Sequence, residues 1–312
     1  MPAMPRAHGN GVELEYETVG DQAGRPLLLV QGLGAQLISV EDGLCQELAS
    51  RGFLVIRYDN RDAGLSTWFD DAGPVNLAAI WGGDHASLAY TLEDMADDAA
   101  AVLDAAGVPA AYVAGISLGG MIAQLLATRH PARVRSLASI MSTTGDRTVG
   151  RPTGEAASVL VASMPGDREG YIEQAVANAK AIGAGTAFPF DAEAVRRGAA
   201  RSYDRAYHPK GTGRQFAAIL AAGDRTQVLG RIRVPTVVVH GEEDQVIAVS
   251  GGEATAAAIP GAGLLRVPGL GHELPPGFWP TLADALVENA NRGTRLESPE
   301  PPNADRADGA GA

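Results

Sequence analysis

The stretch "AGISLGG" (residues 114–120) places Ser117 between glycines, directly after the apolar run "AAYV" (residues 110–113). In an ordinary strand-to-helix turn, the glycines supply unusual backbone angles and the serine caps the helix. In a nucleophile elbow, G-x-S-x-G, a tight turn instead exposes the serine oxygen at the end of a sheet. Because a chain with 39 glycines produces this pattern easily by chance, the surrounding sequence has to decide between the two interpretations.

The composition indicates a globular chain that does not bind nucleic acid. Its 312 residues are 46% hydrophobic, which is enough to bury one large α/β core or two smaller ones. The formal net charge of -12 argues against a nucleic-acid partner, because proteins that bind the phosphate backbone carry a basic face.

The sequence also argues against a metal, an organic cofactor or a membrane span. Cys45 is the only cysteine, so neither an internal disulfide nor a cysteine zinc cage can form. The two lysines, Lys180 and Lys210, do not follow a glycine, which excludes a Walker A loop, and G-x-G-x-x-G is absent. The start of the chain has no apolar signal segment and no run is long enough to span a membrane, so we expect a cytoplasmic protein.

Apolar runs of strand length alternate with helix-like segments, which is typical of an α/β fold with a mostly parallel central sheet flanked by helices. Each run ends in a turn rich in glycine or polar residues, and ligands bind at this edge of open α/β sheets. The predicted strands cover residues 26–30, 53–59, 110–115, 134–142, 234–241 and 263–269.

Helix signals lie between these runs. Residues 91–107 predict an amphipathic helix that starts at a capping box of Thr91 and Asp94 and stops at Gly107. The stretch after Ser117 predicts another helix, and a final helix is expected at about 280–291.

The strand pattern is interrupted once. Residues 143–233 contain helix-like patches separated by prolines, which predicts a helical insertion that forms a lid. Residues 1–142 and 234–292 then form the core, and the polar, proline-rich residues 293–312 are expected to be disordered.

A serine hydroxyl becomes a nucleophile when a histidine, oriented by a carboxylate, takes its proton. His272 is the best candidate, because it lies in the loop "PGLGHELPP" directly after a predicted strand. We expect the other histidines to lie in the N-terminal tail (His8), in exposed loop or lid segments (His85, His208), at a helix end (His130) and at a strand end (His240).

The carboxylate is expected between the serine and the histidine, at the end of another strand. Residues 237–247, "VVVHGEEDQVI", offer Glu242, Glu243 and Asp244. Their position beside a strand end and the histidine loop favours a catalytic acid over a solvated acidic turn, and spacing alone leaves the choice among them open. Two backbone N–H groups would bind an oxyanion, that of Leu118 at the helix start and that of Leu33 in the "QGLG" turn.

Together these motifs resemble the α/β-hydrolase family from about residue 12 to 292. "GISLGG" resembles the elbow, "GEEDQVI" the acid loop, "GLGHELP" the histidine loop and "IRYDNRDAGLST" the D-x-R-G-x-G-x-S segment of that family. The G-x-x-D spacing of the family implies that Asp244 is the acid. Within the family, the "RYDNRDAG" sequence and the position of the predicted lid in the chain are most similar to those of actinobacterial carboxylesterases of the aclacinomycin methylesterase type. Gln31 and Asp62 depart from the family pattern, in which His and Gly are common at these positions.

The resemblance implies a cofactor-free serine hydrolase of carboxylic esters, with Ser117 as nucleophile, His272 as base and Asp244 as its orienting acid. Perhydrolase, lactonase and C–C hydrolase activities share this triad and remain alternatives, as does a non-catalytic ligand receptor of the same fold. Epoxide hydrolases and dehalogenases fit less well, because they use an aspartate where this chain has Ser117.

The predicted lid carries more apolar surface than a solvated lid needs. It indicates a pocket for a small-molecule ester that is neutral and moderately hydrophobic, either with a short to medium acyl chain or as a methyl ester of a bulky ring system. The negative charge of the chain should disfavour anionic substrates, and the sequence does not indicate an oligomeric state. The apolar lid residues are Met164, Tyr171, Phe188, Phe190, Tyr203, Tyr207 and Phe216.

Overall fold

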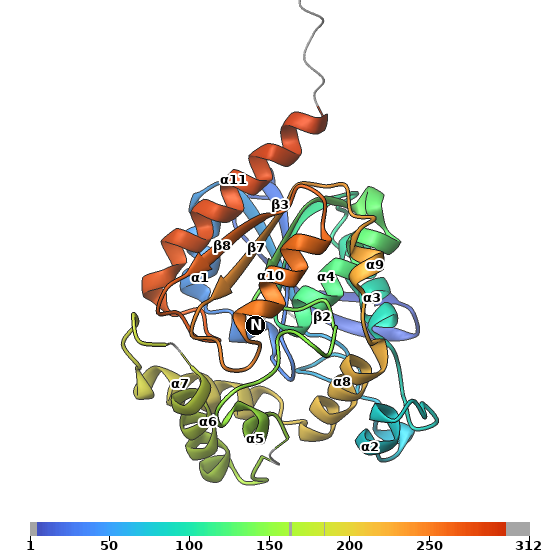
Figure 1. Ribbon diagram of the computed structural model, residues 1–312, viewed down its shortest axis with the longest axis vertical. Coiled ribbons are helices and arrows are strands. Elements are labelled where there is room, and N and C mark those ends of the chain that lie inside the picture. The colour runs from blue at the N-terminus through green and yellow to red at the C-terminus, as the bar shows by residue number, and fades with distance from the viewer. Residues whose placement is uncertain (1–4, 162–163, 184, 298–312) are drawn as a thin grey trace, which may run out of the picture.

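The chain folds around a twisted sheet of eight strands in the order β1-β2-β4-β3-β5-β6-β7-β8 (Figure 1). The computed structural model describes residues 5–161, 164–183 and 185–297. Strands β3 to β8 run parallel, whereas β1 pairs antiparallel with β2, and β2 antiparallel with β4. The strands are β1 (Arg6–Gly9), β2 (Val12–Val19), β3 (Arg25–Val30), β4 (Phe53–Tyr58), β5 (Ala111–Ile116), β6 (Val134–Ile140), β7 (Thr236–Gly241) and β8 (Gly263–Val267).

The six predicted strands are confirmed, and the fold class with them. The sequence analysis did not predict β1 and β2, although Val12, Leu14 and Tyr16 are buried at alternating positions of β2, which is the period of a half-buried strand. His8 lies in β1 and pairs with Glu13, so its placement in an N-terminal tail was wrong.

Helices cover both faces of the sheet. They are α1 (Asp42–Ser50), α2 (Leu77–Trp81), α3 (Leu92–Ala105), α4 (Leu118–Arg129), α5 (Ala156–Val161), α6 (Arg168–Ile182), α7 (Ala192–Arg205), α8 (Pro209–Ala222), α9 (Thr226–Leu229), α10 (Val249–Ala258) and α11 (Trp279–Glu297). The capping box predicted for α3 is present, because the Asp94 N–H donates to Thr91 Oγ1 at 3.2 Å and the Thr91 N–H donates to Asp94 Oδ2 at 2.8 Å.

Strand β3 shows how the two cores form. Its side chains alternate between the faces of the sheet, so that Leu28 and Val30 pack in the core beneath α3 and α4. Leu27 and Leu29 pack in the opposite core with α1 and α11. Because both faces are covered here, the last four residues of the strand, 27–30, are all apolar and buried, as expected for a buried parallel strand.

The chain between β6 and β7 forms α5 to α9. Helices α5, α6 and α7 lie together beyond the end of the sheet toward which the β7 and β8 arrows point (Figure 1). Helix α8 packs against α2 and α3, and α9 contacts α4 and α10 of the core.

Helix α11 runs to Glu297, so residues 293–297 are helical, where the sequence analysis expected the start of a disordered tail. The remaining residues of that predicted tail, 298–312, lie outside the described part of the chain. Within the part that the structure describes, no helix has the length and apolar character needed to cross a membrane.

Candidate active site

Ser117 lies between β5 and α4 in a backbone conformation that close packing imposes. Its φ is 55°, in the left-handed region that L-residues rarely adopt. A Cβ on Gly115 would lie 2.0 Å from Gly119 O, and a Cβ on Gly119 would lie 2.0 Å from Val30 O. Only glycine therefore fits on either side of the serine, which explains the motif by sterics.

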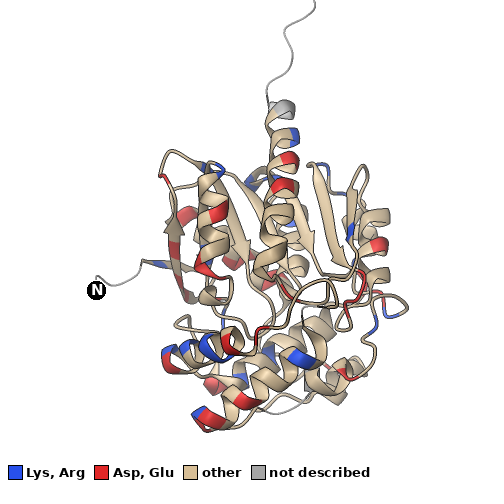
Figure 2. Cartoon of the chain, turned by 90° about the vertical axis from the view of Figure 1, so that its left-hand side faces the viewer, with Lys and Arg blue, Asp and Glu red and all other residues tan. Residues whose placement is uncertain are grey.

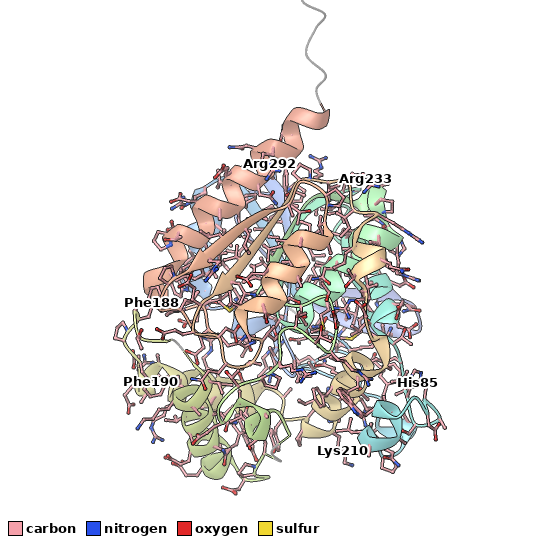
Figure 3. All side chains as sticks on the ribbon, in the orientation of Figure 1. His85, Phe188, Phe190, Lys210, Arg233 and Arg292 are labelled. Atoms are coloured by element: carbon pink, nitrogen blue, oxygen red, sulfur yellow. The ribbon has the colours of Figure 1, made fainter. Side chains whose placement is uncertain are left out.

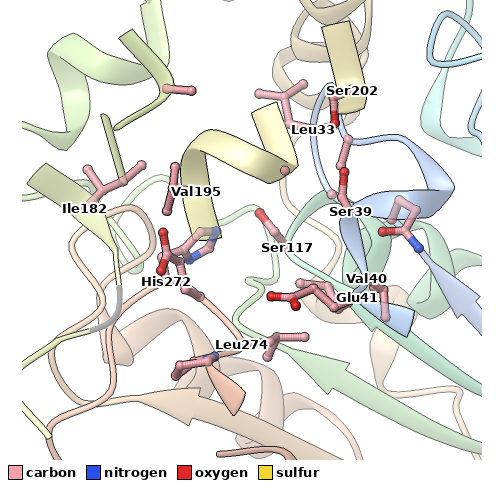
Figure 4. A pocket seen from close by; sticks show the side chains of 18 of the residues that line it. Leu33, Ser39, Val40, Glu41, Ser117, Ile182, Val195, Ser202, His272 and Leu274 are labelled. Carbon is pink, nitrogen blue, oxygen red and sulfur yellow. The ribbon is translucent and has the colours of Figure 1, made fainter. Parts of the chain in front are cut away.

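Hydrogen bonds hold this turn to the neighbouring strand. The Ser117 N–H donates to Ile140 O at 2.8 Å, and Ser142 Oγ donates to Ser117 O at 2.8 Å. The serine is thus fixed at the carboxyl edge of the sheet, where its side chain faces a pocket (Figure 4). Strain of this kind in a well-bonded turn is typical of functional sites.

The loops after β7 and β8 bring Asp244 and His272 together. His272 Nδ1 and Asp244 Oδ2 lie 2.7 Å apart, and the Asp244 side chain is fully buried. The neighbouring Glu243 points elsewhere, because its carboxylate accepts hydrogen bonds from the N–H and the hydroxyl of Thr186 at 2.8 and 2.6 Å. Of the three acidic candidates, Asp244 is the one that pairs with His272, while Glu242 pairs with an arginine on the surface.

Several donors keep Asp244 ionised. Burial acts to raise the pKa of Asp244, but hydrogen bonds from His240 and His272 outweigh it, and the pKa falls to about 2. The N–H groups of Val246 and Ile247 also donate to Asp244 Oδ1, both at 2.9 Å. A carboxylate at the Nδ1 side of His272 favours the tautomer with hydrogen on Nδ1, which leaves Nε2 free to accept a proton.

Ser117 and His272 face each other across the pocket (Figure 4). Their side chains make no direct hydrogen bond in the structure. Bonds of this kind are often long in an enzyme without substrate and shorten when the substrate binds.

Two backbone N–H groups lie near the serine. Leu118 is the first residue of α4, so its N–H has no acceptor within the helix. Residues 32–35 form a turn closed by a 3.3 Å hydrogen bond from the Ala35 N–H to Gly32 O. A Cβ on Gly32 would lie 3.6 Å from Ser117 Cβ, so this 32–35 turn, which contains Leu33, packs directly against the serine. Within the described residues, the Leu33 N–H has no hydrogen-bond acceptor.

The pocket in front of Ser117 has a volume of about 850 Å³. Tyr171, Phe190 and Phe216 from the predicted lid and Trp279 from the core contribute aromatic surface to it. Phe190 lies at the edge of the molecule, close to Phe188 in the chain (Figure 3).

The other apolar lid residues pack as ordinary structure. The ring of Phe188 packs edge-on against Phe278, with ring centroids 6.2 Å apart. The rings of Tyr203 and Tyr207 stack at 4.8 Å, and the Tyr207 hydroxyl donates to Met164 O at 3.2 Å. The expectation of an aromatic pocket therefore holds for part of the set.

Charged side chains also reach the pocket. Glu273 follows His272 in the chain, and burial raises the pKa of its carboxyl to about 7. The helices of the predicted lid carry both acidic and basic side chains (Figure 2). The other charged residues that line the pocket are Glu41, Asp191, Arg197 and Arg201.

The remaining histidines lie outside the pocket lining. His130 ends α4 and lies 2.7 Å from Asp97 Oδ1, as expected for a structural residue. His85 is exposed in the loop after α2 (Figure 3). The side chain of His208 is only 7% exposed, less than the sequence analysis expected, because its ring stacks on Trp68 at 4.1 Å between ring centroids.

The two departures from the family pattern have different consequences. Asp62 has a positive φ of 65°, and its carboxylate accepts two hydrogen bonds from Arg214 of α8, at 2.7 and 2.8 Å. Gln31 is buried and lines the pocket next to the 32–35 turn.

Within the described residues, no group of three or more His, Cys, Asp or Glu side chains is placed to hold a metal ion.

Known proteins share this fold, and some resemble the chain in sequence over most of its length. Residues 25–275 match the family of the alpha/beta hydrolase fold. Rhodomycin D methylesterase of Streptomyces sp. (strain C5) is 29% identical over 315 residues, which covers 91% of this chain and 96% of that protein. The rhodomycin D methylesterase of Streptomyces peucetius is 28% identical over 310 residues, with the same coverage of 91% and 96%. The solved meta-cleavage product hydrolase of Pseudomonas fluorescens has a TM-score of 0.68 at 20% identity, covering 92% of this chain and 97% of that one. The chain belongs to the alpha/beta hydrolase fold family.

Proposed function

We propose that this protein is a serine carboxylesterase that acts on neutral, moderately hydrophobic small-molecule esters. The observation that carries the proposal is the 2.7 Å pair of His272 and Asp244, which faces the strained Ser117 turn across a largely apolar pocket. The relatives named as methylesterases support an esterase activity.

In the proposed reaction, Ser117 Oγ attacks the ester carbonyl while His272 Nε2 takes the hydroxyl proton. Asp244 holds the imidazole ring and stabilises the imidazolium that forms. The negative charge on the former carbonyl oxygen is then stabilised by the N–H groups of Leu118 and Leu33. The dipole at the start of α4 adds to this stabilisation.

Collapse of the tetrahedral intermediate breaks the bond to the alkoxide. The leaving alkoxide takes the proton from His272, so an alcohol departs and an acyl group stays on Ser117. Water then attacks the acyl group with His272 again as base, and the carboxylic acid leaves. The cycle needs no group beyond those of the chain and water.

We further propose that residues 143–233 form a lid on a core made of residues 1–142 and 234–292. The pocket supports this division, because Tyr171 and Phe216 on one side face Ser117 and His272 on the other. A site that excludes water strengthens the electrostatic interactions inside it.

The first prediction concerns the nucleophile. Replacing Ser117 with alanine removes the attacking oxygen, so kcat should fall by roughly 10³ or more. A fluorophosphonate probe should add one covalent label to the wild-type protein and none to Ser117→Ala, as measured by intact-protein mass spectrometry. A label on another serine, or full esterase activity in the variant, would refute the assignment.

The second prediction separates the two neighbouring acids. Asp244→Asn should lower kcat by about 10⁴, because a neutral amide no longer favours the productive histidine tautomer. Glu243→Gln is the matched control, since its carboxylate binds Thr186 instead, and its kcat should stay within about threefold of wild type. The reverse ranking in steady-state kinetics would show that the acid is misassigned.

The third prediction concerns substrate size. A pocket of about 850 Å³ suits a methyl ester of a bulky ring system or an ester with a short to medium acyl chain. We expect kcat/KM to be highest for such neutral esters and to fall for long-chain triglycerides. Measurements on a graded acyl series and a matched peracid assay test this, and a maximum at long chains or peracid formation as the main activity would contradict it.

The fourth prediction uses the carboxyl of Glu273, whose pKa is raised to about 7. The group is mostly neutral below this pH and ionised above it, so it should repel anionic substrates only at higher pH. From about pH 6 to about pH 8, kcat/KM for an anionic ester relative to its neutral isostere should fall by about fivefold, or about 1 kcal/mol. Glu273→Gln should abolish this decrease; a variant that keeps the wild-type slope would show that another group is responsible.

A further inference from the structure

Helix α8 of the predicted lid is anchored in the core by polar side chains. Arg214 makes two hydrogen bonds to Asp62, at 2.7 and 2.8 Å, and both side chains are almost completely buried. A Cβ on Gly211 would lie 2.0 Å from Asp62 O, so the helix backbone also packs closely on this loop. This helix is therefore held against the loops that follow β3 and β4.

The next residue of α8, Gln215, joins these two loops. Its Oε1 accepts a hydrogen bond from the Gly34 N–H at 2.8 Å, and its Nε2 donates to Arg61 O at 2.7 Å. Its exposed fraction is 0%, so water cannot replace either bond. The carboxamide thus bridges the 32–35 turn and the loop after β4 through backbone atoms alone.

The bond to Gly34 determines the form of the 32–35 turn. Gly34 has a φ of 66° and Leu33 does not have a positive φ, which is the pattern of a type II turn. Type I and type II turns differ by a flip of the peptide between the two central residues, here Leu33 and Gly34. The Gly34 N–H belongs to that peptide, so Gln215 holds the peptide in the type II orientation.

We propose that Gln215 is a positioning residue that aims the Leu33 N–H at the reacting carbonyl oxygen, although it lies in the lid and does not reach the substrate. The inference rests on the proposed function, in which Leu33 is an oxyanion donor. The peptide fixed by Gln215 shares the Leu33 Cα with the preceding peptide, which carries the Leu33 N–H and packs through Gly32 against Ser117. The lid then sets the geometry of catalysis as well as covering the pocket.

Two more contacts restrict the same loop from the lid. Thr212 Oγ1 would lie 2.6 Å from a Cβ on Gly34, so α8 also packs on the turn sterically. Gln36 Nε2 donates to Ser202 O and Ala206 O, both at 2.7 Å, and ties the loop to the end of α7. Neither contact holds the peptide between Leu33 and Gly34, so removing the Gln215 carboxamide should release that peptide specifically.

The test replaces Gln215 with methionine, which has a similar volume and cannot make either bond. We expect kcat to fall about 10- to 100-fold with KM within about twofold, because a transition-state contact is weakened while substrate binding is not. The affinity for a boronic acid that mimics the tetrahedral intermediate should fall by a similar factor. The Gly34 amide should also exchange its hydrogen at least about tenfold faster, measured by NMR.

Asn289→Leu is the matched control. Asn289 lies on α11, and its buried side-chain amide likewise donates to a backbone carbonyl, Leu137 O, at 2.9 Å. It should leave kcat, inhibitor affinity and Gly34 exchange unchanged, even where it lowers stability. Gln215→Glu is the second variant: its protonated carboxyl can accept from Gly34 and donate to Arg61 O. Its kcat relative to wild type should therefore rise as the pH falls while KM stays constant, whereas a general loss of pocket structure would change KM as well.

The outcomes separate the two proposals. If wild type hydrolyses esters and Gln215→Met keeps kcat and inhibitor affinity within twofold, the positioning role is wrong and the proposed function stands. If Gln215→Met does not fold, the pH dependence of Gln215→Glu decides, and a flat ratio to wild type overturns the role. If wild type neither hydrolyses esters nor takes a label on Ser117, the proposed function fails, whatever the Gly34 exchange shows.

Discussion

The site depends on the contact of backbone with backbone around Ser117. Gly119 packs on Val30 O so closely that no side chain fits between them, and this contact brings the start of α4 against the end of β3. Ser117 takes its positive φ as a result, and the 32–35 turn that follows β3 lies against it. One steric constraint therefore places the serine and the nearest backbone donors together before any catalytic side chain is considered.

The parallel sheet extends this arrangement across its carboxyl edge. Strands β3, β5, β7 and β8 all run in one direction, so the loops that carry the turn, Ser117, Asp244 and His272 emerge on the same side. Hydrogen bonds inside the protein then determine the charge state of Asp244. Asp244 is buried yet ionised because histidines and backbone N–H groups donate to it, so it orients His272 without taking a proton at neutral pH.

The parts that the sequence predicts are those that depend on local pattern. Ser117 and Asp244 each follow a largely buried strand in a turn, and His272 follows the more exposed strand β8. Contacts between residues that are far apart in the chain could not be predicted from local sequence pattern. The His208 side chain is covered because it stacks on Trp68, 140 positions earlier in the chain. Tyr203 packs on Tyr171 of another helix, at 5.6 Å between ring centroids. The β1–β2 hairpin is different, because the sequence of β2 alternates apolar and acidic residues at positions 12–16, which is a signal for a strand.

The proposed lid contacts both halves of the site through backbone groups. On one side, Gln215 bonds the Gly34 N–H of the turn. On the other, the His272 N–H donates to Gly183 O, at the end of α6, at 2.9 Å, and Thr186 binds Glu243 beside the acid. Phe190 lines the pocket with an apolar side chain, whereas α7 next to it is also held to the core, through Gln36 and through the Arg201–Asp42 ion pair at 3.9 Å. Because apolar contacts are not directional whereas buried hydrogen bonds are costly to break, we expect substrate entry to displace the Phe190 side chain and to leave α8 in place.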